Sequence, residues 1–256
     1  MSLAILVLAA GKGTRMESDL PKILHQLRGQ SLLAHVLEAS RRLNPTRLIA
    51  IVGHKADLVE SEIAPAFPEV EFVLQREMNG TGHAVMQAEE ALKGFEGDIV
   101  VTCGDAPLLT SETLFDLVEK RRHNDAAASM LVGRLDSPGS YGRVVLAEGG
   151  HVQEIVEAKD ASPEILALPT VNAGTYCFRS ADLWAQLSKI GNNNKSGEYY
   201  LTDVVGLLTQ AGEKVVGILI EEREMTGINT KAELAALEQQ LQQEEQLLGE
   251  SEGTPS

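Results

Sequence analysis

A glycine-bearing turn near the start of the chain carries the residues best suited to phosphate chemistry. Gly11 and Gly13 stand in this turn, and the cations Arg15 and Lys22 follow them. Glycine lets backbone N–H groups approach an anion closely, and nearby cations neutralise its charge. A Walker A loop is excluded because no glycine stands four residues before a Gly-Lys-Ser/Thr sequence. The dinucleotide fingerprint is excluded because its third glycine is missing. We therefore expect Arg15 and Lys22 to hold a triphosphate.

Two polar residues far along the chain stand where a cap is common, and the first of them could also ligate a hard cation. Asp105 comes after the apolar run 98–102 and a glycine, and Asn229 precedes the last helical segment. Asp105 could equally be a turn or capping residue, and Asn229 a capping residue. The alternative for Asp105 is a magnesium site, because Mg²⁺ takes one or two protein carboxylates and completes its shell with substrate phosphates. Both interpretations stay open on the residues alone.

Other candidate residues have a plain structural explanation. Glu157 lies in a charged segment that composition favours as a surface turn, His83 suits a structural hydrogen bond, and Cys103 suits a small buried position. The sequence holds no Gly-x-Ser-x-Gly, no His-Glu-x-x-His and no paired-cysteine metal motif. Serine hydrolases of the first pattern and zinc proteases of the second are therefore not indicated.

Residues 1–125 alternate between strand and helix patterns. Strands are expected at 3–8, 47–52, 70–74 and 98–102, and helices at 31–43, 56–63, 84–92 and 110–122. This order predicts an α/β fold with a doubly wound, mostly parallel, Rossmann-like sheet that binds ligands at the carboxyl ends of its strands. The turns at 9–16 and 103–105, Gln75 and the loop 79–83 all follow such ends.

The second half of the chain has closer-spaced strand patterns. Strands are expected at 127–134, 142–147, 151–156, 171–178 and 214–220, with helices at 180–187 and 201–211. They predict a mixed or antiparallel extension that forms a lobe over the site. We expect one domain over residues 1–229, a helix over 230–248 that Thr230 and Glu233 begin as a capping box, and a disordered tail over 249–256.

Composition limits the partners and the compartment. The 256-residue chain is 43% hydrophobic but only 4% aromatic, which predicts an aliphatic core, and its net charge of −15 argues against nucleic-acid and anionic membrane surfaces. No apolar run approaches the ~18 residues of a membrane span. The N-terminus has no basic region of a signal peptide, and the two cysteines show no CxxC spacing. We expect a cytoplasmic protein.

Longer motifs carry a family resemblance. They include the stretch 8–16 with Pro21-Lys22, Gln75 with residues 80–84, and Gly104-Asp105-x-Pro107-Leu108. From about residue 4 to 230 the chain resembles the sugar-phosphate nucleotidyltransferases, and among them the N-acetylglucosamine-1-phosphate uridylyltransferases. The resemblance implies Mg²⁺-dependent transfer of UMP from UTP to N-acetylglucosamine 1-phosphate. The products would be UDP-N-acetylglucosamine, a peptidoglycan precursor for the cell wall, and pyrophosphate.

The same resemblance implies a role for each matching residue. Arg15, Lys22 and Asp105 are implied to be catalytic, and Asp105 and Asn229 to hold Mg²⁺. The substrates are implied to contact a larger set of residues, which comprises Leu8, Ala9, Ala10, Gly11, Gln75, Gly80, Thr81, Cys103 and Gly104 on the nucleotide side and Gly142, Glu157, Asn172 and Thr202 on the sugar side, together with Asn229.

Departures from the family pattern keep alternatives open. Ala106 and Ala173 replace the commoner valine and threonine, so another sugar 1-phosphate such as glucose 1-phosphate, or a cytidylyl donor, is a rival. The hexapeptide repeats of the family's acetyltransferase β-helix are missing. The chain is then a stand-alone enzyme or a piece of a longer protein, and we expect a monomer or weak homo-oligomer. An NAD-dependent oxidoreductase and a non-catalytic UDP-sugar sensor are the rivals from other classes.

Overall fold

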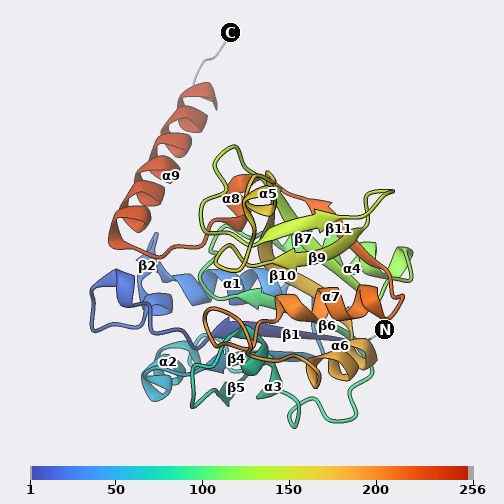
Figure 1. The fold of residues 1–256 in the computed structure, drawn as a ribbon. Helices are drawn as coiled ribbons and strands as arrows, with labels where there is room; N and C mark the ends of the chain where they lie inside the picture. The colour runs from blue at the N-terminus through green and yellow to red at the C-terminus, as the bar shows by residue number, and fades with distance from the viewer. Residues whose placement is uncertain (1, 253–256) are drawn as a thin grey trace.

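The protein is built on one twisted sheet, described for residues 2–252 by a computed structural model (Figure 1). Strand β1 (Ser2–Ala9) lies in its interior, parallel to β4 (Arg47–Val52) on one side and β6 (Gly97–Cys103) on the other. Strand β5 (Val70–Leu74) continues the parallel order beyond β4. Residues 3–7 of β1 are buried, because a parallel sheet is covered on both faces and its strands are apolar on both sides.

The sheet continues beyond β6 with mixed strand directions. Strand β10 (Thr170–Arg179) is antiparallel to both β6 and β7 (Ala128–Arg134), and β11 (Val215–Leu219) is parallel to β7. The hairpin of β8 (Arg143–Leu146) and β9 (Val152–Val156) joins β10 off this path. The predicted parallel sheet with an antiparallel extension is therefore confirmed.

Helices cover both faces of the sheet. Helices α1 (Leu32–Arg41), α2 (Ala56–Ile63) and α4 (Ser111–His123) bury aliphatic residues in one core. Helices α3 (Thr81–Met86), α6 (Ser180–Leu187) and α7 (Thr202–Gln210) do so in the other. Short elements complete the chain: the 3-10 turns η1 (Thr14–Met16) and η2 (Lys22–Leu24), strands β2 (Gln26–Leu27) and β3 (Gln30–Ser31), and helices α5 (Pro163–Leu166) and α8 (Glu222–Met225).

The helix predicted at 84–92 is wrong in its bounds. Helix α3 starts earlier, at Thr81, and ends at Met86, and the chain continues in turns whose N–H groups bond three residues back, as in Gln87 N to Ala84 O at 3.1 Å. The glycines at 80 and 82 predict a loop where the first turn of α3 lies. Gly82 is needed for close approach, since a Cβ there would lie 3.0 Å from the carbonyl oxygen of Tyr199.

Helix α9 (Lys231–Glu252) runs past its predicted end. It begins at the predicted capping box, where Glu233 N donates to Thr230 Oγ1 at 3.1 Å, but continues four residues beyond 248. The polar composition that predicted a tail at 249–256 also suits a solvated helix, so composition did not separate the two. Residues 253–256 of that tail lie outside the described residues. The far end of α9 projects away from the sheet (Figure 1). Among residues 2–252, no helix is long and apolar enough to cross a bilayer.

Candidate active site

The turn after β1 brings its two cations together. Gly13 has a φ of 59° and begins η1, which contains Arg15, while Lys22 begins η2 after Pro21. A Cβ on Gly13 would come within 2.4 Å of the Lys22 Cβ. Since that contact and the positive φ both disfavour any side chain, glycine at this position lets the two halves of the turn touch.

Asp105 reaches the same place from the next strand. In the pairing of β1 with β6, Leu8 lies opposite Cys103, and Gly104 N donates to the Leu8 carbonyl at 2.9 Å. Asp105 therefore leaves the sheet beside the turn that carries Lys22. Its carbonyl oxygen accepts from Ile228 N at 2.9 Å, which draws the segment before α9 to the same edge.

Four side chains meet at this edge in a network of charged and amide groups. The Lys22 ammonium forms an ion pair with Asp105 Oδ2 and donates to Asn229 Oδ1 at 3.0 Å. Arg15 donates to the same Asn229 oxygen at 2.9 Å. Arg15 and Asn229 are 214 residues apart in the chain, so only the tertiary fold joins them. The network pairs one carboxylate with two cations and leaves a positive balance for an anionic ligand.

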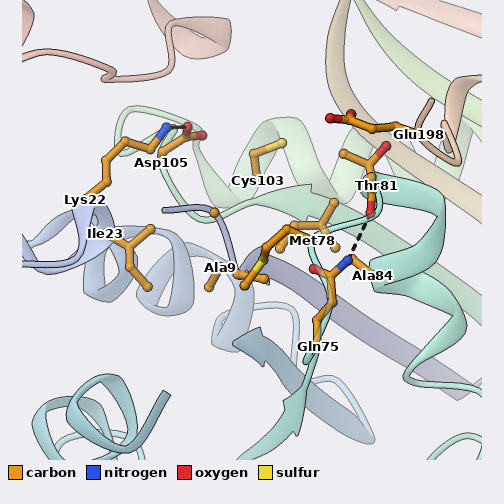
Figure 2. A pocket seen from close by; sticks show the side chains of 14 residues that line it. Ala9, Lys22, Ile23, Gln75, Met78, Thr81, Ala84, Cys103, Asp105 and Glu198 are labelled. Atoms are coloured by element: carbon orange, nitrogen blue, oxygen red, sulfur yellow. Dashed lines mark hydrogen bonds and ion pairs between the residues drawn. The ribbon is translucent and has the colours of Figure 1, made fainter. Parts of the chain in front are cut away.

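A cavity of about 250 Å³ adjoins this network (Figure 2). Its walls combine the end of β1, the residues after β6 and the loop before α3. The residues predicted from sequence that line it are Leu8, Ala9, Ala10, Gly11, Lys22, Gln75, Gly80, Thr81, Cys103 and Asp105, and those that were not assigned a role are Ile23, Met78, Ala84 and Glu198. Ala84 stands within the motif at residues 80–84 that carries the resemblance. Ile23 and Met78 are apolar, and no sequence signal marked them.

The buried side chain of Gln75 is held in one orientation at the far wall of the cavity. Its Nε2 donates to the Gly80 carbonyl at 3.1 Å (Figure 2). The same Nε2 contacts His83 Nδ1, also at 3.1 Å. A carbonyl oxygen can only accept, so this contact places the amide nitrogen toward Gly80 and the amide oxygen Oε1 away from it. His83 thus has a structural hydrogen bond, as the sequence suggested.

The residues predicted for the sugar side form a second group. Thr202 Oγ1 donates to Glu157 Oε1 at 3.1 Å, and a Cβ on Gly142 would lie 3.5 Å from both Glu157 carboxylate oxygens. Asn172 joins them through its N–H, which donates to the Gly142 carbonyl at 2.9 Å. The amide of Asn172 binds Tyr176 and Gly174 at the bulge of β10. This group lies outside the lining of the first cavity.

A second cavity, of about 370 Å³, opens beside this group. Its lining includes Glu157, Asp160, Asn194, Tyr200 and Asp203. The pKa of Glu157 is raised, first by burial and then by the charges of Asp203, Asp160 and Glu198, while the Thr202 hydrogen bond opposes the shift. Glu198 lines the first cavity, so its charge couples the two regions.

Cys103 does not supply a nucleophile. Burial, with a smaller contribution from the Asp105 charge, raises the pKa of its thiol to about 12. Its Sγ faces the Gly174 carbonyl at 3.7 Å. The thiol is therefore protonated at neutral pH, whereas nucleophilic cysteines need a thiolate. The side chain acts as a small wall residue of the cavity.

Comparison with known proteins decides the class. Residues 5–197 match the family model described as MobA-like NTP transferase domain. The chain belongs to this family. It is therefore a nucleotidyltransferase, which confirms the prediction of an enzyme of that class.

The chain is similar to proteins about twice its length. The chain is 45% identical over 236 residues to the bifunctional protein GlmU of Lactobacillus delbrueckii subsp. bulgaricus. The aligned residues cover 92% of this chain and 50% of the relative. It is 44% identical over 234 residues to the bifunctional protein GlmU of Streptococcus gordonii, covering 91% and 50%. The chain thus spans about half the length of these curated relatives. The matches confirm the predicted family resemblance.

Solved structures share the fold of this chain. A UDP-glucose pyrophosphorylase complexed with UDP-glucose superposes with a TM-score of 0.76 at 19% identity, covering 95% of this chain and 100% of the other. The inositol-1-phosphate CTP transferase from T. maritima gives 0.71 at 15% identity, covering 90% of each. At these identities the likeness concerns the fold alone.

The donor set at the sheet edge suits a divalent cation. Asp105 Oδ2 and Asn229 Oδ1 both contact the Lys22 ammonium, so a carboxylate and an amide oxygen converge on a point that a cation already fills. The described residues form no group of three or more His, Cys, Asp or Glu side chains able to hold a metal. A Mg²⁺ ion here would take its other oxygens from substrate phosphates and water, as is common for this ion.

Proposed function

We propose that this chain transfers UMP from UTP to N-acetylglucosamine 1-phosphate and releases pyrophosphate. The observation that carries the proposal is the convergence of Arg15, Lys22, Asp105 and Asn229 beside the first cavity. The choice of substrates rests on the identity of 45% to a protein named GlmU and on the motifs shared with N-acetylglucosamine-1-phosphate uridylyltransferases. The proposal concerns the transferase reaction alone, since the chain spans half of those relatives.

The nucleophile in this reaction is a phosphate oxygen of the sugar phosphate. A phosphomonoester has a second pKa of about 6, so it is largely a dianion at pH 7. It needs no general base. Its oxygen attacks the α-phosphorus of UTP, the new P–O bond forms, and the bond to the β-phosphate oxygen breaks and releases pyrophosphate. Every proton stays in place, and the task of the protein is to bring two anions together in line.

Charge repulsion is the main barrier that the protein must offset. Two unit charges of the same sign repel by about 4 kcal/mol at ~4 Å with an effective dielectric near 20. Arg15 and Lys22 are placed to neutralise the triphosphate as it meets the sugar phosphate. Asp105 and Asn229 would hold Mg²⁺, which supplies further positive charge at the phosphoryl oxygens. Positioning and charge stabilisation together then account for catalysis.

The orientation of Gln75 supports a uracil base. Its amide nitrogen is engaged with Gly80, so Oε1 is the atom left for a ligand, and it can accept the N3–H of uracil. Cytosine has an unprotonated N3 that would face this oxygen with a second acceptor.

We expect Gln75→Ala to reduce the preference for UTP over CTP about tenfold, measured as the ratio of kcat/KM values, because one hydrogen bond of about 1–2 kcal/mol is lost. Gln87→Ala, which removes a glutamine that donates to the His83 carbonyl, is the control that keeps the ratio. An unchanged ratio in Gln75→Ala would contradict the role of Gln75.

Glu157 is placed to bind the sugar substrate. Its carboxylate is half-buried and partnered by Thr202, and sugar hydroxyl groups would add donors to it. We expect Glu157→Ala to raise the KM for the sugar phosphate about tenfold while the KM for UTP changes little, as loss of one charged hydrogen bond predicts. Glu148→Ala, in the exposed turn between β8 and β9, serves as the control. Equal increases in both KM values would contradict the sugar-side position.

A substrate panel tests the proposal as a whole. Pyrophosphate release is measured for UTP, CTP and dTTP, each with N-acetylglucosamine 1-phosphate and glucose 1-phosphate, with and without Mg²⁺. The expected result is highest kcat/KM for UTP with N-acetylglucosamine 1-phosphate and loss of activity in EDTA. Higher activity with another pair would assign the alternative substrate, and tight binding of the sugar nucleotide without turnover would identify a sensor.

A further inference from the structure

The first turn of helix α9 is hydrogen-bonded to the residue that carries the amide ligand of the site. Glu233 Oε2 accepts from Asn229 N at 2.6 Å and from Thr230 N at 3.2 Å. Thr230 Oγ1 accepts in return from Glu233 N at 3.1 Å. This reciprocal pair is a capping box. Because it includes Asn229 N–H, the carboxylate that begins the helix also fixes the backbone of Asn229.

The side chain of Asn229 is fixed from the opposite side. Its Nδ2 donates to the Gly227 carbonyl at 3.0 Å, and Ile228 N donates to the Asp105 carbonyl at 2.9 Å. The amide nitrogen is thereby occupied within its own loop. Its oxygen Oδ1 is turned to Lys22 and Arg15. With the backbone held by Glu233 and the amide held by Gly227, Oδ1 has one direction to point.

The base of α9 is anchored well enough to act as a support. Leu234, Leu237 and Leu241 pack with Leu27, Leu32 and Ile228. Lys231, in the first turn of α9, donates from its ammonium to the Glu17 carbonyl at 3.0 Å. Glu17 ends η1, the 3-10 turn that contains Arg15. The helix start therefore contacts both the cationic turn and the Asn229 loop.

We infer that Glu233 is a positioning residue, which orients Asn229 as a ligand for the metal–triphosphate complex. The inference rests on the proposed function, because it takes Asn229 Oδ1 as a cation ligand. A carboxylate that accepts a backbone N–H makes a stronger bond than a neutral acceptor. Outer partners of metal ligands are generally worth about 10- to 100-fold in metal affinity. Glu233 is exposed to solvent, so the low end of that range is expected.

The test separates positioning from charge and from helix stability. The affinity of the whole chain for UTP is measured by calorimetry, once with Mn²⁺ and once with EDTA. The affinity with Mn²⁺ divided by the affinity in EDTA is the metal-dependent gain. Glu233→Ala is expected to lower that gain about tenfold and to leave the affinity in EDTA unchanged. Glu233→Gln keeps an acceptor for the capping box but removes the charge, and it is expected to retain most of the gain.

A matched control lies on the same helix. Glu238 also accepts a backbone N–H, that of Arg28 at 3.1 Å, so Glu238→Ala removes the same kind of group without touching Asn229. It is expected to keep the full gain. The inference is overturned if Glu233→Ala keeps the gain, if Glu233→Gln loses as much as Glu233→Ala, or if Glu238→Ala loses as much as either.

A second measurement needs neither metal nor nucleotide. Amide hydrogen exchange at Asn229, followed by NMR, is expected to be about tenfold faster in Glu233→Ala than in the wild type and to change little in Glu233→Gln, since one protecting hydrogen bond of about 1.4 kcal/mol is lost. If the wild type shows no metal-dependent gain for UTP, the proposed function is overturned and the exchange rate decides the positioning role. Unchanged exchange in Glu233→Ala overturns that role.

Discussion

Replacing Asp105 by alanine is expected to lower kcat at least about a thousandfold, equivalent to about 4 kcal/mol of transition-state stabilisation. Asp105 is the carboxylate of the site network, and its Oδ2 converges with Asn229 Oδ1 on one point. Without it, the site keeps two cations but loses the anionic ligand for Mg²⁺, which is expected to contribute several kcal/mol at a phosphoryl transition state. The measurement is steady-state pyrophosphate release as a function of Mg²⁺ concentration.

Two companion variants sharpen this experiment. Asp105→Asn keeps an oxygen in the same place but not the charge, so its kcat is expected to fall less than that of Asp105→Ala and to recover in part at high Mg²⁺. Asp116→Ala removes an exposed carboxylate of helix α4 and is expected to behave as the wild type. Turnover by Asp105→Ala at the wild-type rate in low Mg²⁺ would rule out the metal role of Asp105.

The sequence predicted the parts of the site that follow strand ends. Apolar runs at 3–8 and 98–102 identified two parallel strands, and parallel strands present their carboxyl ends at one edge. That geometry is enough to expect Lys22 and Asp105 near each other, although they are 83 residues apart. The glycine pattern of the turn predicted a phosphate ligand and, because it lacked their spacing, argued against the Walker A and dinucleotide motifs.

Other parts of the site could not be deduced from local patterns. Nothing near Asn229 indicates that Ile228 binds the Asp105 carbonyl, since this bond depends on how the segment after β11 returns to the sheet edge. The family resemblance, not periodicity, led to Asn229. Local sequence also does not predict that the Lys22 ammonium lies between Asp105 and Asn229. A lysine side chain is long and flexible, so the surrounding charges of the folded protein determine which groups it contacts.

The bounds of α3 show a different limit. The pattern of apolar residues at 84, 85, 88 and 92 is helical, and all four residues are buried, yet regular helix ends at Met86. The turns that follow still direct Ala88 and Leu92 into the same core as Ala84 and Val85, although most of their bonds run three residues back. Periodicity therefore identified the buried face but not the hydrogen-bond pattern.

Lys22→Ala is expected to lower kcat and also to lower the Mg²⁺ concentration that gives the half-maximal rate. The ammonium lies between Asp105 and Asn229, so under the proposed function it holds the position that Mg²⁺ would take, and the two cations would compete for the same oxygens. Under the proposed function, Asp105 and Asn229 would hold Mg²⁺ only when the Lys22 ammonium leaves them, and the ammonium would then be available to neutralise the phosphates. Removing the side chain takes away the competitor and also takes away a cation of the transition state.

For Lys22→Ala we expect kcat to fall about 100- to 1,000-fold, as for loss of one preorganised charge at a reacting group, with little change in the KM for UTP. The Mg²⁺ concentration for half-maximal rate is expected to fall, because the competing ammonium is absent. Lys22→Arg keeps a charge but not a compact ammonium, so it should recover only part of kcat. Lys120→Ala, on helix α4, is the control.

The two readouts together make the assignment decisive. If Lys22 only filled space or stabilised the turn, Lys22→Ala would lower kcat without lowering the half-maximal Mg²⁺ concentration. If Lys22 bound UTP equally well in the ground state and in the transition state, Lys22→Ala would raise the KM for UTP and leave kcat unchanged. A lower kcat together with a lower half-maximal Mg²⁺ concentration is the expected pattern. It would follow if one ammonium occupies the proposed metal position in the free protein and neutralises the phosphates during the reaction.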